Sequence, residues 1–309
     1  MSATSSPTPD AVRRLTVSDI GRLYADGERI PMLTAYDYPT AKLLDEAGIP
    51  MLLVGDSLGR AMLGYENELS VTMADMLHHA AAVTRGARRA LVIGDMPFLT
   101  YATPEDALKN AGLFIHDAQV QAVKVEGGVR SARIIETLVK AGIPVMAHIG
   151  LTPQSANAIG KFRVQGKTAD QARSLLHDAL AIQEAGAFSV VLELVPEQLS
   201  AAITDRLRIP TIGIGAGAGC SGQVQIINDM LGLDTWQPKH AKLYANLRES
   251  ILGAARAYAA EVAAGTFPGP DQTVRMDDAV LDEVLGRTAQ DAAPDAGAPA
   301  GGIPLDRDL

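Results

Sequence analysis

Polar and charged side chains end or interrupt several short apolar runs of this sequence, where a solvent-exposed loop would need no such order. The residues concerned are Asp56, Ser57, Asp95, Lys124, Glu126, His148 and Glu193. Each lies in, or at the end of, a run rich in Val, Leu and Ile. A charge among such residues is unfavourable by several kcal/mol unless it is paired or bound to a metal. The pattern therefore predicts one functional site to which successive elements each contribute one or two groups.

The spacing within two of these runs indicates where the charges point. Lys124 and Glu126 are two residues apart, so in a strand they project to one face while the intervening valine projects to the other. Glu193 lies in the middle of a run, flanked by leucines, where a carboxylate has no capping role. Lys124 and Glu126 are therefore predicted to share one face of their strand, while Glu193 shares its face with Val191 and Val195.

The residue types favour metal-assisted carbanion chemistry. Two aspartates and a glutamate offer hard oxygen ligands, which suit Mg²⁺ or a similar divalent ion better than structural zinc. A metal together with Lys124 could clamp the carboxylate and carbonyl oxygens of an α-keto acid. That chelation stabilises the enolate formed when a base removes the adjacent C–H proton, and Glu193, on a separate strand, is the candidate base.

Structural interpretations of the same residues stay open when each is taken alone. Asp56 or Asp95 could cap a loop. Lys124 and Glu126 could form a salt bridge, and His148 could be a satisfied buried histidine. The repetition of polar groups at the same end of five successive strands favours a functional site, although a non-catalytic binding barrel remains an alternative.

The elements that must position these groups alternate along the chain. Apolar strand-like runs are followed by stretches of helical periodicity, which indicates parallel strands joined by helices and favours a single-domain α/β fold, a (β/α)8 TIM barrel. The runs cover residues 31–36, 50–56, 91–97, 122–128, 144–150, 188–195 and 210–217, with a weaker eighth near 234–240. Thr72, Thr103 and Thr168 have the spacing of helix N-caps. An open doubly wound sheet is less favoured, because no glycine-rich turn follows the first run.

Length and composition set the boundaries of the domain and exclude several classes of protein. Of the 309 residues, 47% are hydrophobic and the net charge is −9, which argues against a nucleic-acid partner. No apolar stretch is long enough to span a membrane, no secretory signal opens the sequence, and Cys220 stands alone, so a cytoplasmic protein is expected. We expect a disordered segment over residues 1–14, a catalytic barrel over 15–268, and a largely disordered extension over 269–309 with a weak helix near 276–285.

Several motifs in series resemble the ketopantoate hydroxymethyltransferase family. The matching stretches are "MLTAYDYPTAKLLDEAGIPMLLVGDSLG", "VTMADMLHHAAAVTRGA", "GDMPF", "AVKVEGG", "GIPVMAHIGLTPQS", "FRVQG", "VVLELVP" and "IPTIGIGAG". The resemblance implies a (β/α)8 barrel enzyme that transfers a hydroxymethyl group from 5,10-methylenetetrahydrofolate to 3-methyl-2-oxobutanoate. The product would be 2-dehydropantoate, in the first step of pantothenate biosynthesis. It also implies a homo-oligomer, commonly a decamer.

The resemblance assigns roles to the same residues. Asp56 and Asp95 match Mg²⁺ ligands that also contact substrate, and Glu126 matches a third carboxylate at the metal, acting through water. Ser57 and Lys124 match substrate contacts. Glu193 matches the proton acceptor, and His148 lines the same pocket as a further substrate-binding group.

The sequence departs from the family pattern outside these groups. The departures are Glu68, Ser70, Lys161, Ser221 and Gln225. Because of these departures, the sequence does not establish that the loop on the folate side and the contacts between subunits match those of the family. One rival interpretation is a Mg²⁺-dependent enolate enzyme of the phosphoenolpyruvate mutase and isocitrate lyase kind. Lyases of that kind need a catalytic cysteine in a glycine-rich loop, for which Cys220 is a poor candidate.

Overall fold

The computed structural model describes residues 13–160 and 162–287. The chain divides after Arg248 into two compact units. The predicted catalytic domain, residues 15–268, extends past this division, and its boundaries stay predictions. Most of the predicted N-terminal segment and the end of the predicted extension lie outside the described residues, as does Lys161.

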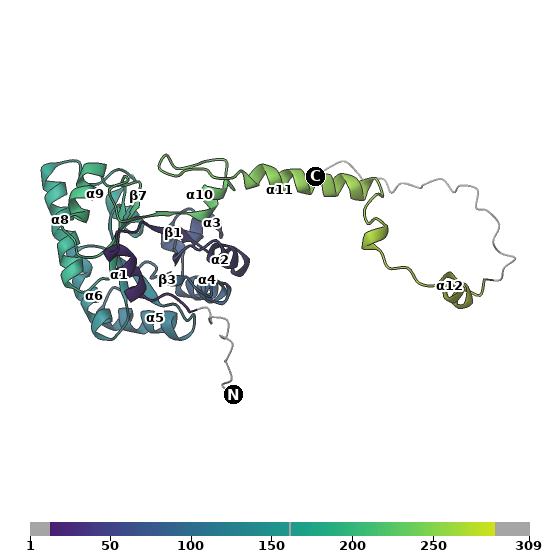
Figure 1. The fold of residues 1–309 in the computed structure, drawn as a ribbon, viewed down its shortest axis with the longest axis horizontal. Helices are drawn as coiled ribbons and strands as arrows, with labels where there is room; N and C mark the ends of the chain where they lie inside the picture. The colour runs from purple at the N-terminus through teal and green to yellow at the C-terminus, as the bar shows by residue number, and fades with distance from the viewer. Residues whose placement is uncertain (1–12, 161, 288–309) are drawn as a thin grey trace, which may run out of the picture. The chain divides into compact units, whose positions relative to one another are not determined.

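Eight parallel strands close into a barrel in sequence order, which confirms the predicted (β/α)8 fold (Figure 1). They are β1 (Ile30–Thr34), β2 (Met51–Val54), β3 (Leu91–Asp95), β4 (Ala122–Glu126), β5 (Val145–Gly150), β6 (Ser189–Glu193), β7 (Thr211–Ile214) and β8 (Gly222–Gln225). Strand β1 pairs with both β2 and β8, so the sheet has no free edge. All strands run in one direction, and their carboxyl ends therefore meet at one mouth.

Side chains alternate between the inside of the barrel and the layer beneath the helices. In β2, Met51 and Leu53 belong to the apolar cluster inside the barrel, whereas Leu52 and Val54 pack outward. In β4, Ala122 lies inside and the two valines lie outside, which puts Lys124 and Glu126 together on the inner face. The spacing predicts that they share a face.

Helices cover the outside of the barrel (Figure 1). Besides the N-terminal helix, the α-helices that lie wholly in the first unit are α2 (Tyr38–Glu46), α3 (Leu58–Ala61), α4 (Met73–Gly86), α5 (Pro104–His116), α6 (Val129–Lys140), α7 (Ala156–Ile159), α8 (Ala169–Glu184), α9 (Glu197–Thr204) and α10 (Ile227–Leu231), with 3₁₀ turns η1 (Glu68–Ser70) and η2 (Pro153–Ser155). Thr72, Thr103 and Thr168 cap α4, α5 and α8 as predicted. Phe114 of α5 packs over Gly94 of β3, where a Cβ would lie 2.5 Å from its ring.

The bottom of the barrel contacts a separate N-terminal helix, α1 (Val17–Ala25). Ile20 of α1 is fully buried and belongs to the apolar cluster inside the barrel. Asp19 accepts hydrogen bonds from the backbone and hydroxyl of Thr16 and pairs with Arg13 and Arg22. The helix therefore occupies the end of the barrel opposite the predicted site.

The predicted position of the eighth strand is wrong. Strand β8 directly follows the loop after β7, and residues 234–240 form a loop instead. Only Gly222 and Val224 of β8 are buried, while Gln223 is exposed, so the strand shows too few apolar residues to stand out in the sequence.

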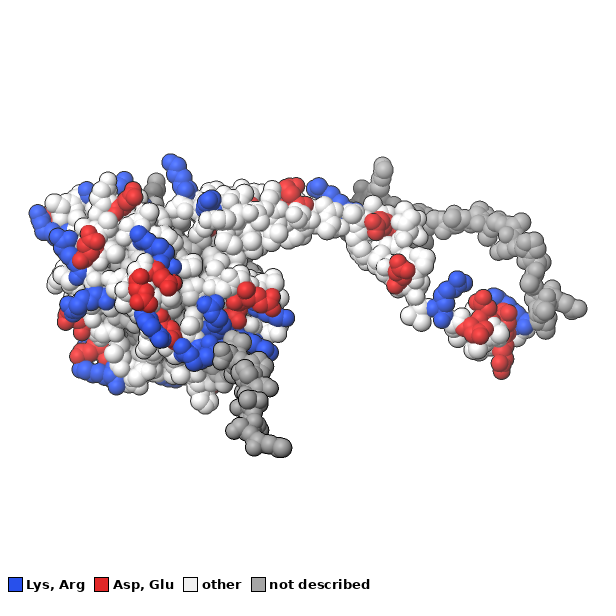
Figure 2. Space-filling view, in the orientation of Figure 1, with Lys and Arg blue, Asp and Glu red and all other residues white. Residues whose placement is uncertain are grey.

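The second unit contains most of α11 (Leu247–Ala263), then η3 (Pro270–Gln272) and α12 (Asp278–Leu285), close to the predicted weak helix. No helix of the described residues is both long enough and apolar enough to cross a bilayer. On the face of the barrel seen in Figure 2, acidic and basic side chains are interspersed and do not separate into patches.

Candidate active site

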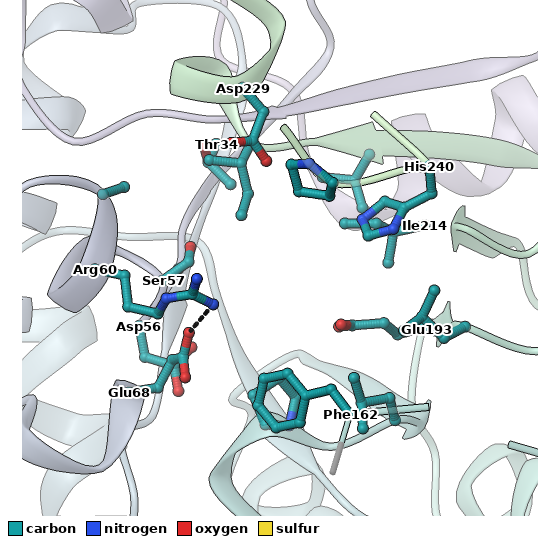
Figure 3. Close-up of a pocket in the computed structure, with 18 of the residues that line it drawn as sticks. Thr34, Asp56, Ser57, Arg60, Glu68, Phe162, Glu193, Ile214, Asp229 and His240 are labelled. Carbon is teal, nitrogen blue, oxygen red and sulfur yellow. Dashed lines mark ion pairs between the residues drawn. The ribbon is translucent and has the colours of Figure 1, made fainter. Parts of the chain in front are cut away.

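All seven predicted site residues line one cavity of about 750 Å³ at the carboxyl ends of the strands. Figure 3 shows Asp56 and Ser57 on one wall and Glu193 reaching in from the opposite wall. Asp56, Asp95, Lys124, Glu126 and His148 are each at most 5% exposed. The structure therefore brings the predicted residues together, as the positions of the strand ends require.

Asp56 and Asp95 are neighbours across the ends of β2 and β3. The backbone N–H of Asp56 donates to Asp95 Oδ2 over 3.0 Å, while Asp95 Oδ1 is buried and forms no hydrogen bond. Burial raises the pKa of both carboxyl groups, and the charge of Asp95 raises that of Asp56 further. Two buried carboxylates side by side are unfavourable without a cation between or near them.

Lys124 supplies a positive charge within this group. Its Nζ lies 2.9 Å from Asp95 Oδ2 and 4.0 Å from Glu126 Oε1. Burial would lower the pKa of the lysine, but the carboxylates of Asp95, Glu126 and Asp56 outweigh it and raise the pKa. The lysine therefore stays protonated at neutral pH and balances only part of the negative charge around it.

His148 connects the metal-side carboxylates with Glu193. Its Nδ1 lies 3.2 Å from Glu126 Oε1 and its Nε2 lies 3.2 Å from Glu193 Oε2. Burial and the nearby lysine lower the pKa of His148, yet the carboxylates of Glu126 and Glu193 raise it to about 9. Burial also opposes ionisation of Glu126, but its partners His148 and Lys124 lower the pKa of that carboxyl group overall.

The backbone after Glu193 directs this carboxylate into the cavity. Leu194 has a φ of +47°, a left-handed conformation that is rare for a leucine and is found often at functional sites. Gly150 of β5, paired with Glu193, has a φ of +96°, and a Cβ there would lie 2.3 Å from the Glu193 carbonyl oxygen. Only glycine permits this approach of β5 to β6 beside the candidate base.

Gln154 holds the acidic residues in place and was not identified from the sequence. Its Nε2 donates to Asp56 Oδ2 over 2.8 Å and to the Met96 carbonyl over 2.9 Å, and its backbone N–H donates to Glu126 Oε2 over 3.2 Å. The Tyr101 hydroxyl donates to Oε1 of the same amide. A neutral residue in the "TPQS" loop carries no sign of this role except its place in a stretch that resembles the family.

Two further polar contacts line the walls of the cavity. The Tyr36 hydroxyl lies 2.8 Å from Ser57 Oγ, which fixes the serine beside Asp56. Arg60 Nη1 lies 3.8 Å from Oε1 of Glu68, a carboxylate that is 5% exposed and whose pKa is raised by burial (Figure 3). Glu68 is one of the departures from the family pattern, and of the four departures that the structure describes it is the one that lines this cavity.

Two other departures help to hold the β7–β8 region together. Ser221 Oγ accepts a hydrogen bond from the Thr211 backbone over 3.2 Å, and Gln225 Oε1 accepts one from the Lys242 backbone over 2.6 Å. The first ties the loop before β8 to β7, and the second ties β8 to the loop that follows α10.

The donor set fits a hard cation. Asp95 Oδ1 and Glu126 Oε1 are buried oxygens that form no hydrogen bond, and the lysine is outnumbered by the carboxylates around it. No three His, Cys, Asp or Glu side chains of residues 13–160 and 162–287 converge closely enough to hold a metal by themselves. Mg²⁺ commonly binds through one or two carboxylates and completes its shell with water and substrate oxygens, which this geometry permits.

Comparisons with known proteins agree with the geometry. Residues 14–270 match the family model described as ketopantoate hydroxymethyltransferase. A 3-methyl-2-oxobutanoate hydroxymethyltransferase of Chloroflexus aurantiacus is 59% identical over 278 residues, which cover 90% of this chain and 99% of that protein. One of the same name from Dehalococcoides mccartyi is 55% identical and covers 88% of this chain and 98% of its own length.

Solved structures share the fold at much lower identity. A phosphoenolpyruvate phosphomutase from Streptomyces platensis superposes with a TM-score of 0.55 at 16% identity, covering 88% of this chain and 96% of that one. A 2,3-dimethylmalate lyase, a member of the phosphoenolpyruvate mutase and isocitrate lyase superfamily, gives 0.52 at 16% identity, covering 91% and 99%. At these identities the likeness shows a shared fold.

Proposed function

Because the chain belongs to the ketopantoate hydroxymethyltransferase family, we propose that it transfers a hydroxymethyl group from 5,10-methylenetetrahydrofolate to 3-methyl-2-oxobutanoate, giving 2-dehydropantoate. The observation that carries the proposal is the cluster of buried carboxylates at the strand ends, with one lysine among them and a separate glutamate facing them. Such a cluster is unfavourable in an apoprotein and useful to a reaction that develops negative charge beside a cation.

In this proposal, Asp56 and Asp95 hold Mg²⁺, and Glu126 supports it through water. When bound, the ion would polarise the carboxylate and carbonyl oxygens of the keto acid. The Lys124 ammonium, buried beside Asp95, would attract the same oxygens, and Ser57 Oγ would donate a hydrogen bond to the substrate. The site is closed at the bottom by the apolar interior of the barrel, so the keto acid enters from the mouth.

Glu193 is the proposed general base. Its side chain is 17% exposed, which leaves it accessible to a substrate in the cavity, and it extends toward the opposite wall. His148 touches it at 3.2 Å and would orient the carboxylate. Removal of the C3 proton by Glu193 would generate an enolate whose negative charge develops toward Lys124. The C3 carbon would then attack the methylene carbon of the folate as the bond from that carbon to N10 breaks. Cleavage of its remaining bond to N5, with a water molecule supplying the hydroxyl group, would release the hydroxymethylated keto acid and tetrahydrofolate.

The transfer reaction itself tests the proposal. Purified protein with Mg²⁺, 3-methyl-2-oxobutanoate and 5,10-methylenetetrahydrofolate should form 2-dehydropantoate, which NMR detects. Mixtures without the folate, and mixtures with the Asp95→Ala variant, should form none. A wild-type protein that binds the keto acid but forms no product with any one-carbon folate would contradict the proposal.

The family relationship also supports two coarser proposals about the intact protein. We propose a homo-oligomer, a decamer as is common in the family, that acts in the cytoplasm on small-molecule substrates. The intermixed charges on the visible face of the barrel give no support for a nucleic-acid partner (Figure 2).

A further inference from the structure

The cavity has a second wall that the proposed metal and keto-acid site does not use. This wall, here called the β7–β8–β1 wall, consists of Thr34, Ile214, Val224, Ile226, Asp229 and His240. Figure 3 shows Thr34, Asp229 and His240 on the side of the cavity away from Phe162. Apart from Thr34, whose hydroxyl accepts a bond from the Ile227 backbone, the polar groups of this wall are the Asp229 carboxylate and the His240 ring.

Asp229 is held rigidly at the top of the cavity. It lies in α10, where the preceding residue Asn228 donates from Nδ2 to the Ala61 carbonyl over 2.9 Å. The residue before that, Ile227, donates its backbone N–H to Thr34 Oγ1 over 3.0 Å. The next residue, Met230, accepts a backbone hydrogen bond from Tyr244 over 2.9 Å. The backbone of Asp229 is therefore fixed from three sides, although its side chain contributes to none of these bonds.

The Asp229 carboxylate has no hydrogen-bond donor within the described part of the chain. It is half-buried, burial raises its pKa, and the nearby charges of His240 and Arg60 oppose this rise. Arg60 pairs instead with Glu68 on the neighbouring wall. In Figure 3 the Asp229 oxygens point into the empty centre of the cavity. A carboxylate that is held in place in a mostly apolar wall has two oxygens that can accept hydrogen bonds. It can therefore bind a ligand that presents two adjacent N–H donors.

The proposed cosubstrate carries such a pair of donors. The pterin ring of a folate presents its 2-amino group and its N3–H side by side, and its flat faces suit walls built from isoleucine and valine. We propose that the β7–β8–β1 wall binds the pterin of the folate cosubstrate and that Asp229 determines this specificity by accepting hydrogen bonds from the 2-amino group and N3–H. This inference rests on the proposed function, and it assigns the folate to the side of the cavity away from the buried carboxylates.

Glu68 provides a matched control. It is another carboxylate that lines the cavity outside the proposed metal and base residues, but it is 5% exposed and already paired with Arg60. Its Oε2 forms no hydrogen bond but is buried, so an incoming ligand has little access to it. Glu68→Gln keeps the shape of the side chain and changes a carboxylate of the same cavity without removing the proposed pterin contact.

The test measures binding of tetrahydrofolate by anaerobic calorimetry to the full-length protein with Mg²⁺ and keto acid present. Asp229→Asn keeps the size of the side chain but turns one acceptor oxygen into a donor, so the dissociation constant should rise about 10- to 100-fold. Glu68→Gln should change it less than about threefold. A tetrahydrofolate with a methyl group in place of the 2-amino group should bind wild type about 10- to 100-fold more weakly and should lose no further affinity on Asp229→Asn.

The same samples separate this inference from the proposed function. Exchange of the C3 hydrogen of the keto acid with solvent deuterium needs no folate and reports an intact fold and metal site. If Asp229→Asn retains exchange but binds tetrahydrofolate as wild type does, the assignment of Asp229 is wrong. It is equally wrong if the penalty for the missing 2-amino group persists undiminished in Asp229→Asn. If wild type neither exchanges nor binds tetrahydrofolate, the proposed function fails first.

Discussion

Replacing Lys124 by methionine removes the ammonium group that lies among Asp56, Asp95 and Glu126. The lysine side chain is 5% exposed and its Nζ lies 2.9 Å from Asp95 Oδ2. Breaking a buried pair by removing one partner costs about 3–5 kcal/mol, because the remaining charge stays buried and uncompensated. For a domain of the size of the barrel unit, this loss of stability corresponds to a fall of about 6–20 °C in the midpoint temperature of unfolding.

Three comparisons test whether the loss of stability in Lys124→Met comes from the uncompensated charge of the neighbouring carboxylates. Lys140→Met breaks an exposed pair with Glu136, in which the side chains are 73% and 52% exposed, and should leave the unfolding midpoint almost unchanged because solvent screens such a pair. Adding Mg²⁺ should recover part of the loss in Lys124→Met, because the ion supplies the missing positive charge. The double variant Lys124→Met/Asp95→Asn should be more stable than Lys124→Met alone, since it removes one of the uncompensated charges.

The pH dependence has a defined sign. Burial already raises the pKa of Asp56 and Asp95, and removing Lys124 removes a charge that lowers both. The folded variant then takes up protons more readily than the unfolded chain, so the stability gap to wild type should shrink as the pH falls from about 8 to about 5. Calorimetric unfolding across this range measures the gap. A Lys124→Met protein as stable as wild type without metal, or a gap that widens on acidification, would refute the electrostatic account of the site.

Further predictions concern the base, the N-terminal helix and the assembly. Glu193→Gln should slow exchange of the C3 hydrogen of 3-methyl-2-oxobutanoate by about 10²–10⁴, yet retain metal-dependent binding of the keto acid by calorimetry, whereas Asp95→Ala should lose both. Exchange at the wild-type rate in Glu193→Gln would move the role of base elsewhere, with His148 next in line. Hydrogen bonds from Arg13 and Thr16 lower the pKa of Asp19, so its contribution to stability is present above about pH 4 and is lost on further acidification. Asp19→Asn should therefore flatten the acid limb of the unfolding curve, and parallel curves for the two proteins would rule this out. Sedimentation should show a homo-oligomer, a decamer by the family resemblance, and an active species that stays monomeric would contradict the expectation.

The strand ends of the site could be predicted because they combine two signals. Residues such as Asp95 and Glu193 are charges in apolar runs, and parallel strands bring their carboxyl ends to one mouth. The alternation that places Lys124 and Glu126 inside the barrel follows from the period of a strand alone. The strand ends and the alternation of side chains can be predicted because they depend on the local sequence and on a parallel barrel, a fold with few alternative arrangements.

The features that sequence reasoning missed depend on contacts between distant segments. Strand β8 has Val224 as its one large buried side chain, so its identity comes from pairing with β1 and β7. Gln154 gains its importance from Asp56 and Met96, which are far away in the chain. The second wall around Asp229 forms because α10 is tied to β1 and α3 by single hydrogen bonds. No period or spacing in the sequence carries this information.

We expect the cluster of buried carboxylates to support metal-dependent removal of a proton next to a keto group. Wild-type protein in deuterium oxide, with Mg²⁺ and 3-methyl-2-oxobutanoate but without folate, tests it by proton NMR of the C3 hydrogen. Exchange should proceed well above the rate in a protein-free control and should be lost when the metal is chelated. Exchange that persists at the same rate after chelation, or that never exceeds the control, would contradict it.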